Sequence, residues 1–292
     1  MKIAVGIPTI GRAPILVETL RELALQTRQP DAIIVCGTKS SDLTGVADAA
    51  PDAVMLITGA GLPRQRNMIV DATALFDVIV FFDDDFLPSP GYLSEIERCM
   101  ISDPGIVVVT GKVIADGING PGLTPEAGRR ILKDLAEKPL ARLGSVPTFS
   151  GYGCNMAVRL LPMRLHLLRF DERLPFYGWQ EDVDLSRRLA RFGRVVLLND
   201  AQGIHLGAKS GRGSGVRLGY SQVSNPIYLA GKRQGYPLRR AITHILKNMA
   251  MNTAKASWPE PHVDRRGRLI GNILALRDLM VGKMRPEKVL EL

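Results

Sequence analysis

Three consecutive carboxylates, Asp83, Asp84 and Asp85, directly follow an apolar run at residues 78–82. Adjacent carboxylates repel one another and gain nothing from packing, whereas a divalent cation offsets that repulsion. Oxygen ligands suit Mg²⁺ or Mn²⁺, and Mg²⁺ is characteristically shared between carboxylates and phosphate oxygens. A solvated acidic turn is the alternative, but the hydrophobic strand expected just before the triplet favours a metal. We therefore predict a Mg²⁺ or Mn²⁺ site whose natural partner is a diphosphate.

A second acidic cluster, Glu181, Asp182 and Asp184, opens a helix that we expect over residues 182–192. Acidic side chains in a first turn are favoured by the helix dipole, so the cluster can be purely structural. A carboxylate beside the aromatic residues at 176–179 could equally act as a general base toward a hydroxyl acceptor. The residues alone leave both interpretations open.

Polar and basic residues also gather where the expected strands end. A lone histidine such as His205 is more often an ordinary polar residue than a ligand, but this one precedes a loop carrying Lys209 and Arg212. Such cations can bind phosphates. Arg12 and Arg66 each fall at a predicted strand-to-helix turn, and this shared location argues against two unrelated surface cations.

The elements that must position these residues alternate along the chain. Unbroken apolar runs predict strands at residues 2–8, 32–36, 52–58, 78–82 and 106–111, and a further strand at 194–198. Helical spacing predicts helices over 14–27, 63–75 and about 127–138. Alternation with unbroken strands indicates an α/β fold with a parallel sheet covered on both faces. In such sheets ligands sit outside the carboxyl ends of the strands.

Composition limits the class of protein. The 292 residues are 46% hydrophobic and 23% charged, which excludes disorder, collagen and coiled coil as the main structure. No apolar stretch reaches the roughly 18 residues needed to span a bilayer, and no signal-peptide core follows Met1. Three widely spaced cysteines form neither a disulfide framework nor a metal cluster. We expect a cytoplasmic location.

The net charge of +9 is concentrated at the end of the chain, because residues 206–292 hold 16 basic and 5 acidic side chains. Residues 269–281 show helical spacing and are flanked by cations. This basic segment either packs on the preceding domain or makes a peripheral contact with an anionic membrane. Nucleic acid is not expected as a partner, because aromatic residues make up only 5% and do not alternate with basic ones.

Taken in order, several short blocks resemble the family 2 glycosyltransferases. They are Pro-Thr-Ile-Gly-Arg at 8–12, Arg-Asn at 66–67, Phe-Phe-Asp-Asp-Asp at 81–85, Gly-Cys-Asn-Met-Ala at 153–157, Phe-Asp-Glu at 170–172 and Glu-Asp-Val-Asp-Leu at 181–185. The resemblance covers roughly residues 2–230. It implies a GT-A fold, a mostly parallel sheet flanked by helices, in which residues 1–111 bind the nucleotide sugar and 112–230 bind the acceptor. Residues 231–292 would form a basic helical C-terminal extension.

The resemblance also implies roles for the residues. Asp85 would bind the metal directly, with Asp83 and His205 beside it, and Asp83 or Asp84 would lie nearer the ribose or sugar. Asp182 would be the catalytic base, and Glu181 would position the acceptor or share that role. The remaining donor-binding residues implied are Pro8, Thr9, Arg12, Arg66, Asn67, Lys209 and Arg212.

One departure from the family pattern concerns the nucleobase. Members of the family usually have an aspartate that recognises uracil after the second strand. Here residues 35–42 are Val-Cys-Gly-Thr-Lys-Ser-Ser-Asp. Asp42 comes too late in the chain to substitute. The base of the donor therefore stays open.

The function implied is inverting, metal-dependent transfer of a sugar from a nucleoside-diphosphate donor to a hydroxyl of a glycan or lipid-linked acceptor. Cell-surface polysaccharide synthesis at the inner face of the membrane is the expected setting. A sugar-phosphate nucleotidyltransferase is one alternative, although residues 8–12 match its Gly-rich loop poorly. A non-enzymatic nucleic-acid-binding protein is another, although it leaves both carboxylate clusters without a purpose.

Overall fold

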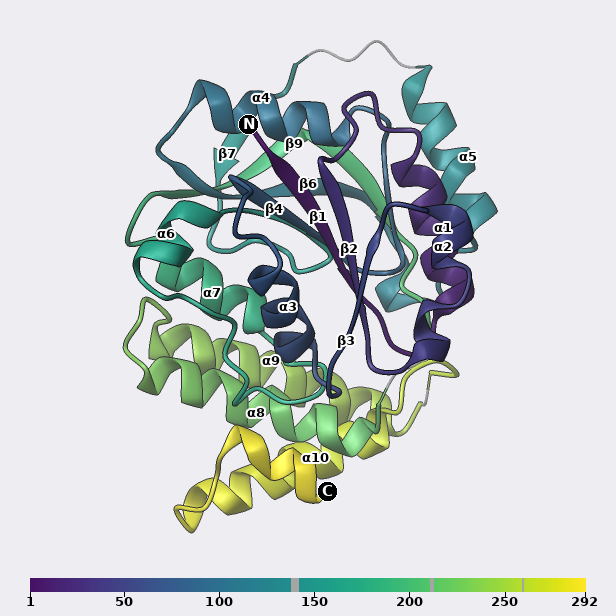
Figure 1. The fold of residues 1–292 in the computed structure, drawn as a ribbon. Helices are drawn as coiled ribbons and strands as arrows, with labels where there is room; N and C mark the ends of the chain where they lie inside the picture. Colours follow the sequence, from purple (N-terminus) through teal and green to yellow (C-terminus); the bar gives the residue numbers. More distant parts are fainter. Residues whose placement is uncertain (138–141, 211–212, 259) are drawn as a thin grey trace. The chain divides into compact units, whose positions relative to one another are not determined.

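A computed structural model describes residues 1–137, 142–210, 213–258 and 260–292 of the chain (Figure 1). Contacts divide the chain into two compact units. The first comprises residues 1–60, 64–169 and 189–211, and the second comprises residues 61–63, 170–188 and 212–292. Each unit is described by itself below.

The first unit is built on one sheet with the strand order β3-β2-β1-β4-β8-β6-β9-β5, and β7 also pairs with β9. Its parallel portion consists of four short apolar strands: β1 (Ile3–Pro8), β2 (Ala32–Gly37), β3 (Val54–Ile57) and β4 (Val78–Phe82). The side chains of β1 and β4 are buried, those of β2 are largely buried, and those of β3, at the edge of the sheet, are mostly exposed. These four strands are the first four expected, and the α/β, GT-A-type sheet predicted from the sequence is confirmed.

The other half of the sheet mixes directions. β8 (Asn155–Arg159) runs antiparallel between β4 and β6 (Ile106–Asp116), and β6 pairs in parallel with β9 (Arg194–His205). Two three-residue strands, β5 (Phe86–Pro88) and β7 (Ser145–Pro147), add antiparallel pairs to β9. Both β6 and β9 are longer than expected from their apolar runs.

Strand β8 was not predicted, because it begins with a polar residue. The buried Asn155 side chain accepts a hydrogen bond from Thr110 Oγ1 (2.7 Å) and donates one to the carbonyl of Gly111 (2.9 Å). A buried amide satisfied on both sides costs little, so the strand needs no unbroken apolar run.

Three helices associated with the sheet were predicted, and their ends are shifted: α1 (Ala13–Leu23), α3 (Leu62–Asp71) and α5 (Pro125–Ala136). Helices α2 (Val46–Ala49), α4 (Tyr92–Ser102) and α6 (Leu160–Leu165) and the short 3₁₀ turns η1 (Ser40–Leu43) and η2 (Gly117–Asn119) were not predicted. Pro14 lies in the first turn of α1, where its missing N–H is no loss.

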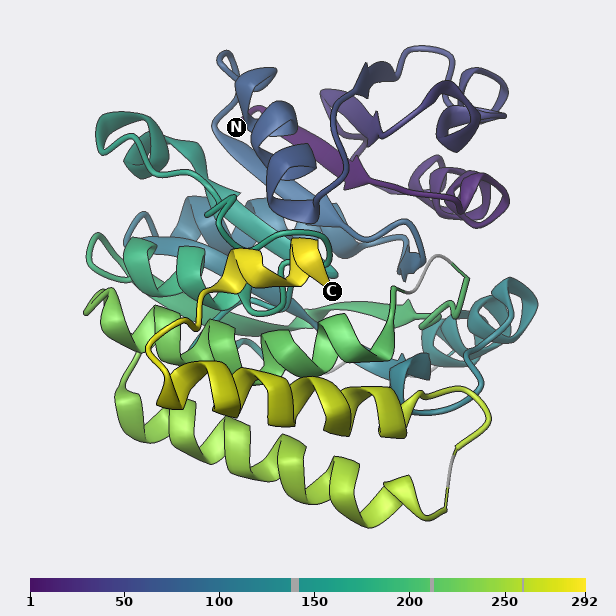
Figure 2. The same cartoon turned by 90° about the horizontal axis from the view of Figure 1, so that it is seen from below.

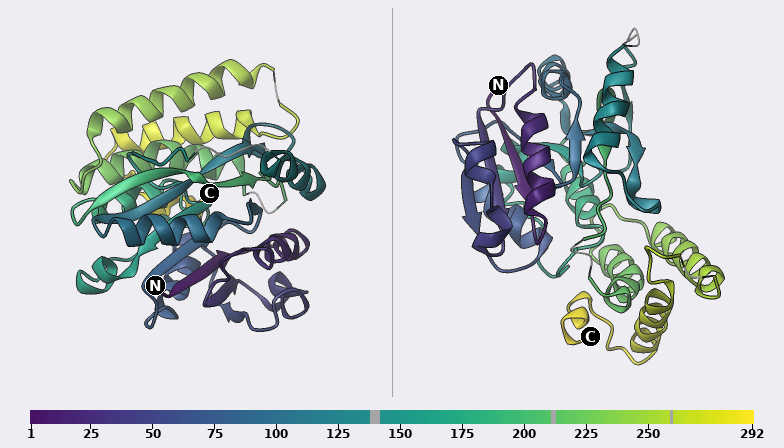
Figure 3. Two further views of the ribbon diagram at one scale, coloured as in Figure 1. Left: turned by 90° about the horizontal axis from the view of Figure 1, so that it is seen from above. Right: turned by 90° about the vertical axis from the view of Figure 1, so that its right-hand side faces the viewer.

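The second unit contains α7 (Glu181–Leu189, whose last residue belongs to the first unit) and a layer of three long helices. These are α8 (Gly215–Gly231), α9 (Leu238–Ala256) and α10 (Arg265–Met280), followed by η3 (Pro286–Glu291). The three helices lie side by side in Figures 2 and 3. The helix expected at 269–281 therefore begins four residues earlier, at Arg265, where Asp264 caps it by accepting from the Gly267 N–H (2.7 Å).

Glycines allow α8 and α10 to approach closely. A Cβ added at Gly219 would lie 2.1 Å from the Arg268 carbonyl, and one at Gly271 would lie 2.0 Å from the Val216 carbonyl. Beside this contact, buried amides join all three helices, since Asn252 Nδ2 donates both to Gln222 Oε1 and to Asn272 Oδ1 (2.9 Å each). Buried amides must pair with one another, so this network fixes how the helices align.

No helix in the described ranges is long and apolar enough to cross a membrane.

Candidate metal and donor site

The aspartate triplet forms a tight turn between β4 and β5. The Phe86 N–H donates to the Asp83 carbonyl (3.1 Å), and the Asp83 N–H donates to the Cys154 carbonyl (3.1 Å). Phe82 and Phe86, on either side of the turn, stack with their ring centroids 5.1 Å apart. Apolar packing on both sides therefore holds three carboxylates in place despite their repulsion.

Asp84 is directed into the protein and is held by the end of β1. Its carboxylate accepts from Thr9 Oγ1 (2.8 Å) and from Arg12 Nη1 (3.0 Å). Burial raises the pKa of Asp84, while the charge of Arg12 acts in the opposite direction. The Thr9 and Arg12 side chains, predicted to line the nucleotide pocket, thus contact the aspartate motif itself, and Pro8 is the last residue of β1.

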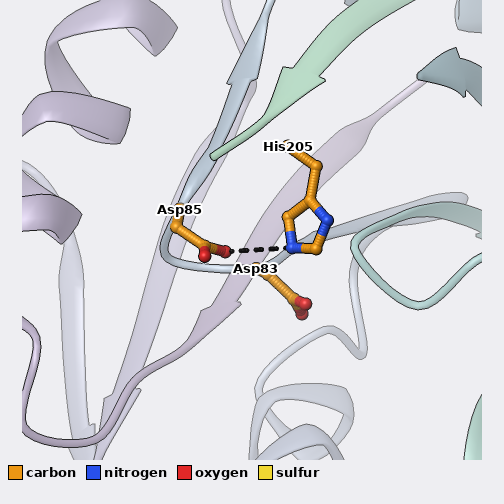
Figure 4. Close-up of side chains that lie close together, drawn as sticks. All are labelled: Asp83, Asp85 and His205. Atoms are coloured by element: carbon orange, nitrogen blue, oxygen red, sulfur yellow. Dashed lines mark ion pairs between the residues drawn. The ribbon is translucent and has the colours of Figure 1, made fainter. Parts of the chain in front are cut away.

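Asp83, Asp85 and His205 converge on one point (Figure 4). One ligand atom of each lies within 4.8 Å of the others. Asp85 and His205 are buried, whereas the Asp83 side chain is 26% exposed. Figure 4 shows the carboxylates of both aspartates on the Nε2 side of the imidazole ring.

Asp85 has one carboxylate oxygen bound by protein and one facing the histidine. Its Oδ2 accepts from the Ala208 N–H (2.7 Å). Its buried Oδ1 makes no hydrogen bond within the described part of the chain and lies 3.4 Å from His205 Nε2. Burial raises the pKa of Asp85, but His205, Arg12 and the Ala208 N–H outweigh burial and lower it. An ionised, incompletely bonded oxygen beside an imidazole nitrogen fits a divalent cation.

His205 is oriented from its other side by Asp116, which the sequence analysis did not single out. His205 Nδ1 lies 2.8 Å from Asp116 Oδ1, and Tyr152 Oη donates to Asp116 Oδ2 (3.0 Å). Burial lowers the pKa of His205, but the neighbouring carboxylates of Asp116 and Asp85 outweigh it and raise the pKa to about 10. A carboxylate behind a ligating histidine is the usual arrangement that fixes its tautomer and direction at a metal.

Arg66 lies on α3 and is completely buried. Its Nη2 donates to Asp83 Oδ1 (3.1 Å) and to the Gly153 carbonyl (2.7 Å), and its guanidinium lies 5.4 Å from the centre of the Phe81 ring. The charge of Arg66 therefore stands beside the proposed ligand Asp83. Asn67 follows it on the same helix and is also buried.

Hydrogen bonds join the loop after β9 to the turn after β6. Lys209 Nζ donates to the carbonyls of Gly117 (3.0 Å) and Ile118 (2.9 Å). Arg12 Nε donates to the Ser210 carbonyl (2.7 Å), so the same loop is also joined to the β1 end. Arg212, predicted to bind the donor, lies outside the described residues.

Both carboxylate oxygens of Asp42 accept hydrogen bonds from the protein's own loops. Its Oδ1 accepts from the Gly11 N–H (2.9 Å), and its Oδ2 accepts from Thr38 Oγ1 (2.6 Å), the Thr38 N–H (2.9 Å) and the Lys39 N–H (3.2 Å). Burial raises the pKa of Asp42, but these bonds outweigh it and lower the pKa. The carboxylate joins the loops that follow β1 and β2.

In the second unit, Glu181 and Asp182 are the first two residues of α7. Asp182 is partly exposed and its Oδ1 accepts from the Val183 N–H (2.7 Å), whereas Glu181 is buried. Asp184 is bound by Lys232 Nζ (2.6 Å) and by Arg188 (2.8 Å). Ion pairs thus account for the position of Asp184.

The residue before this pair, Gln180, was not predicted and is unusual. It has a φ of 71°, which non-glycine residues rarely adopt. Gln180 Nε2 donates to His244 Nδ1 (2.9 Å), and Tyr236 Oη donates to Gln180 Oε1 (3.0 Å). Burial, together with Arg240 and Lys247, lowers the pKa of His244 and so keeps Nδ1 an acceptor. Strained backbone held by buried hydrogen bonds is characteristic of functional segments.

The family is shown by comparison with known proteins. The model of the family described as Glycosyltransferase like family 2 matches residues 2–202, so the chain belongs to the family 2 glycosyltransferases. It is therefore an enzyme of that class, as the resemblance implied. None of the curated proteins matches the chain.

Solved structures with the same fold are distant in sequence. TarS 1–349 from S. aureus has a TM-score of 0.60 at 17% identity, with 99% of this chain and 82% of that chain covered. The full TarS chain is covered to 44%. The mannosyltransferase PcManGT from Pyrobaculum calidifontis, solved with GDP-Man and Mn²⁺, has a TM-score of 0.57 at 17% identity, covering 99% and 85%.

A third structure, glucosyl-3-phosphoglycerate synthase from Mycobacterium tuberculosis, was solved with Mn²⁺, UDP and its product. It has a TM-score of 0.52 at 21% identity, covering 81% of each chain. At these identities the likeness establishes the GT-A fold alone.

Proposed function

We propose that the chain transfers a sugar from a nucleoside-diphosphate donor to a hydroxyl of a glycan or lipid-linked acceptor, with inversion at the anomeric carbon. The observation that carries the proposal is the convergence of Asp83, Asp85 and His205, with Asp116 behind the histidine. Similar proteins bind UDP-GlcNAc and, with Mn²⁺, GDP-Man, which supports a nucleotide-sugar donor.

Asp83, Asp85 and His205 would hold the divalent cation. A cation bound there would neutralise charge that builds on the departing nucleoside diphosphate. Two carboxylates with one imidazole nitrogen favour Mn²⁺ over Mg²⁺, because Mg²⁺ strongly prefers oxygen ligands.

The chain's own residues then have separate tasks. Arg12 and Arg66 hold Asp84 and Asp83 in place, so the motif keeps its shape when the donor binds and leaves. Asp182 takes the proton from the acceptor hydroxyl as that oxygen attacks the anomeric carbon, and the bond to the diphosphate breaks on the opposite face. General-base assistance of this kind contributes about 10²–10⁴-fold.

The test is a screen of nucleotide sugars with Mn²⁺. Its two readouts are the rise in the melting temperature of the protein and the release of the nucleoside diphosphate. Release of pyrophosphate instead would indicate a nucleotidyltransferase and refute the proposal. Asp182→Asn should leave Mn²⁺-dependent donor binding intact while transfer falls about 10²–10⁴-fold. A variant with unchanged turnover would remove Asp182 from the role of base.

The setting proposed is cell-surface polysaccharide synthesis on the cytoplasmic side of the membrane. Support comes from the basic character of residues 206–292. Detection of the native protein in membrane and soluble fractions of its cell, with and without a high-salt wash, tests this setting.

A further inference from the structure

Large apolar side chains are exposed on the solvent-facing sides of α9 and α10, although these helices cover the buried amide network on their inner sides. Leu246 is 61% exposed and Met280 is 80% exposed. Both belong to a set of large apolar side chains that are exposed on the two helices, called here the outer strip: Leu238, Ile242, Leu246, Ile270, Ile273 and Met280.

The spacing places the apolar residues of the outer strip on one side of each helix. Leu238, Ile242 and Leu246 follow one another at intervals of four along α9, so they lie on one side of it. On α10, Ile270, Ile273 and Met280 recur at intervals of three and seven and share a side in the same way. The two helices contact each other and lie side by side (Figure 2).

The charges around the outer strip are all positive. Helix α9 contains no acidic residue, and its exposed Arg239 and Lys247 make no ion pair within the described part of the chain. On α10, Arg266 and Arg277 lie on the same side as the apolar residues and are exposed.

The acidic residues of this region are occupied elsewhere. Asp278 is buried and accepts from Tyr220 Oη (3.0 Å), as well as lying 3.3 Å from Arg277. Glu260 pairs with Lys255 and Arg265, and Asp264 caps α10. Asp278 thus pairs with Arg277, whereas no acidic side chain in the described ranges forms an ion pair with Arg239, Lys247 or Arg266.

We propose that the outer strip binds the surface of an anionic phospholipid bilayer, with its apolar side chains in the interfacial region and the cations against the headgroups. Amphipathic helices with exposed apolar residues and flanking Lys and Arg bind membranes in this way. Trp258, which is 81% exposed between α9 and α10, is of the residue type favoured at such interfaces. The biological use of this contact rests on the proposed function, because it would bring the enzyme to a lipid-linked acceptor.

A second copy of the chain fits this surface less well. Pairing two outer strips would bring the unpaired cations Arg239, Lys247 and Arg266 of both copies together, and like charges disfavour association. An anionic bilayer satisfies both the apolar residues and the cations. The surface therefore favours lipid over self-association.

The experiment is sedimentation of the full chain with vesicles of phosphatidylcholine alone or with phosphatidylglycerol. Binding is expected only to the anionic vesicles and should fall with added salt. Replacing Arg239, Lys247 and Arg277 by Gln should weaken partitioning about 100-fold, at about fivefold for each cation. Replacing Ile242, Leu246 and Ile273 by Gln should weaken it at least as much.

The matched control replaces three exposed apolar residues of the first unit, Leu25, Leu75 and Ile101, by Gln. This control should bind vesicles like the wild type. Equal melting temperatures would show that each variant is folded, as expected for substitutions of exposed side chains.

Three outcomes would overturn the proposal: wild-type protein that stays in the supernatant, equal binding to neutral vesicles, or loss of binding in the control as large as in the strip variants. Size-exclusion chromatography with light scattering gives a fourth outcome that would overturn it. In that outcome the wild type is a dimer that does not bind vesicles, and the Gln variants of the outer strip are monomers. Release of nucleoside diphosphate from a soluble acceptor is measured in parallel. Activity without vesicle binding refutes only the membrane contact, and binding without activity refutes only the glycosyltransferase mechanism.

Discussion

Replacing Asp42 with Asn tests whether this carboxylate supports the structure or recognises a base. Four donors reach its two oxygens, three of them at Oδ2. An Asn side chain must direct its NH₂ group at one of these two sets, so at least one donor loses its acceptor. Each hydrogen bond to a charged group contributes about 1.5–3 kcal/mol, so we expect a loss of about 2–4 kcal/mol of stability.

The sign of the pH dependence follows from the lowered pKa of Asp42. A carboxylate whose pKa is lower in the folded state stabilises the protein above its unfolded pKa, and this contribution is lost as pH falls through the folded pKa. The difference in melting temperature between wild type and Asp42→Asn should therefore be largest near neutral pH and shrink below about pH 4. Asp48→Asn, on exposed α2 surface, is the control and should melt like the wild type at both pH values.

The assay for function uses the same variant. If Asp42 acts only as a structural acceptor, Asp42→Asn lowers the melting temperature by several degrees and keeps the relative affinities for uridine and guanosine diphosphates. A variant of wild-type stability with an altered base preference would refute the reasoning, because it would mean that the carboxylate faces the donor.

Further predictions concern the metal, the α7 start and the helix layer. Asp116→Asn should weaken Mn²⁺ binding about 10–100-fold in calorimetry without donor, since it leaves the ligands but changes the group that orients His205; unchanged affinity would contradict this. Gln180→Gly keeps the left-handed backbone but removes the side-chain bonds, so kcat should fall about tenfold or more at constant donor KM. A similar fall in donor affinity would point to general damage. Gly219→Leu should lower the melting temperature, because its side chain would collide with the Arg268 carbonyl. A neutral effect would mean that α8 and α10 do not pack as described.

Much of the first half of the fold could be predicted from the sequence, because the four parallel strands are unbroken apolar runs, as buried strands such as β1 and β4 require. The same rule missed β8, where Asn155 replaces apolar burial with hydrogen bonds. The same rule placed the predicted ends of β6 at residue 111 and of β9 at residue 198, because both strands continue with more polar residues. Pairing across the sheet, which single-strand patterns do not reveal, carries these strands further.

Only those residues of the candidate metal site that have a recognisable type and position in the sequence could be predicted. Asp83 and Asp85 are recognisable because they interrupt an apolar run, and His205 because the family places a histidine there. Asp116 was missed because only the register that puts it opposite His205 brings them together. A buried glutamine has no distinctive sequence signal, so Gln180 could be found only from its backbone angle and its partners.

Helix α9 has two different surroundings on its two sides. One side of it carries His244, which accepts from Gln180 at the start of α7, and the other carries the exposed apolar residues of the outer strip. A displacement of this helix would therefore act on the segment that carries Glu181 and Asp182 through the 2.9 Å hydrogen bond between His244 and Gln180. Under the two proposals above, which make Asp182 the base and the outer strip a bilayer contact, turnover should rise when the protein binds anionic vesicles.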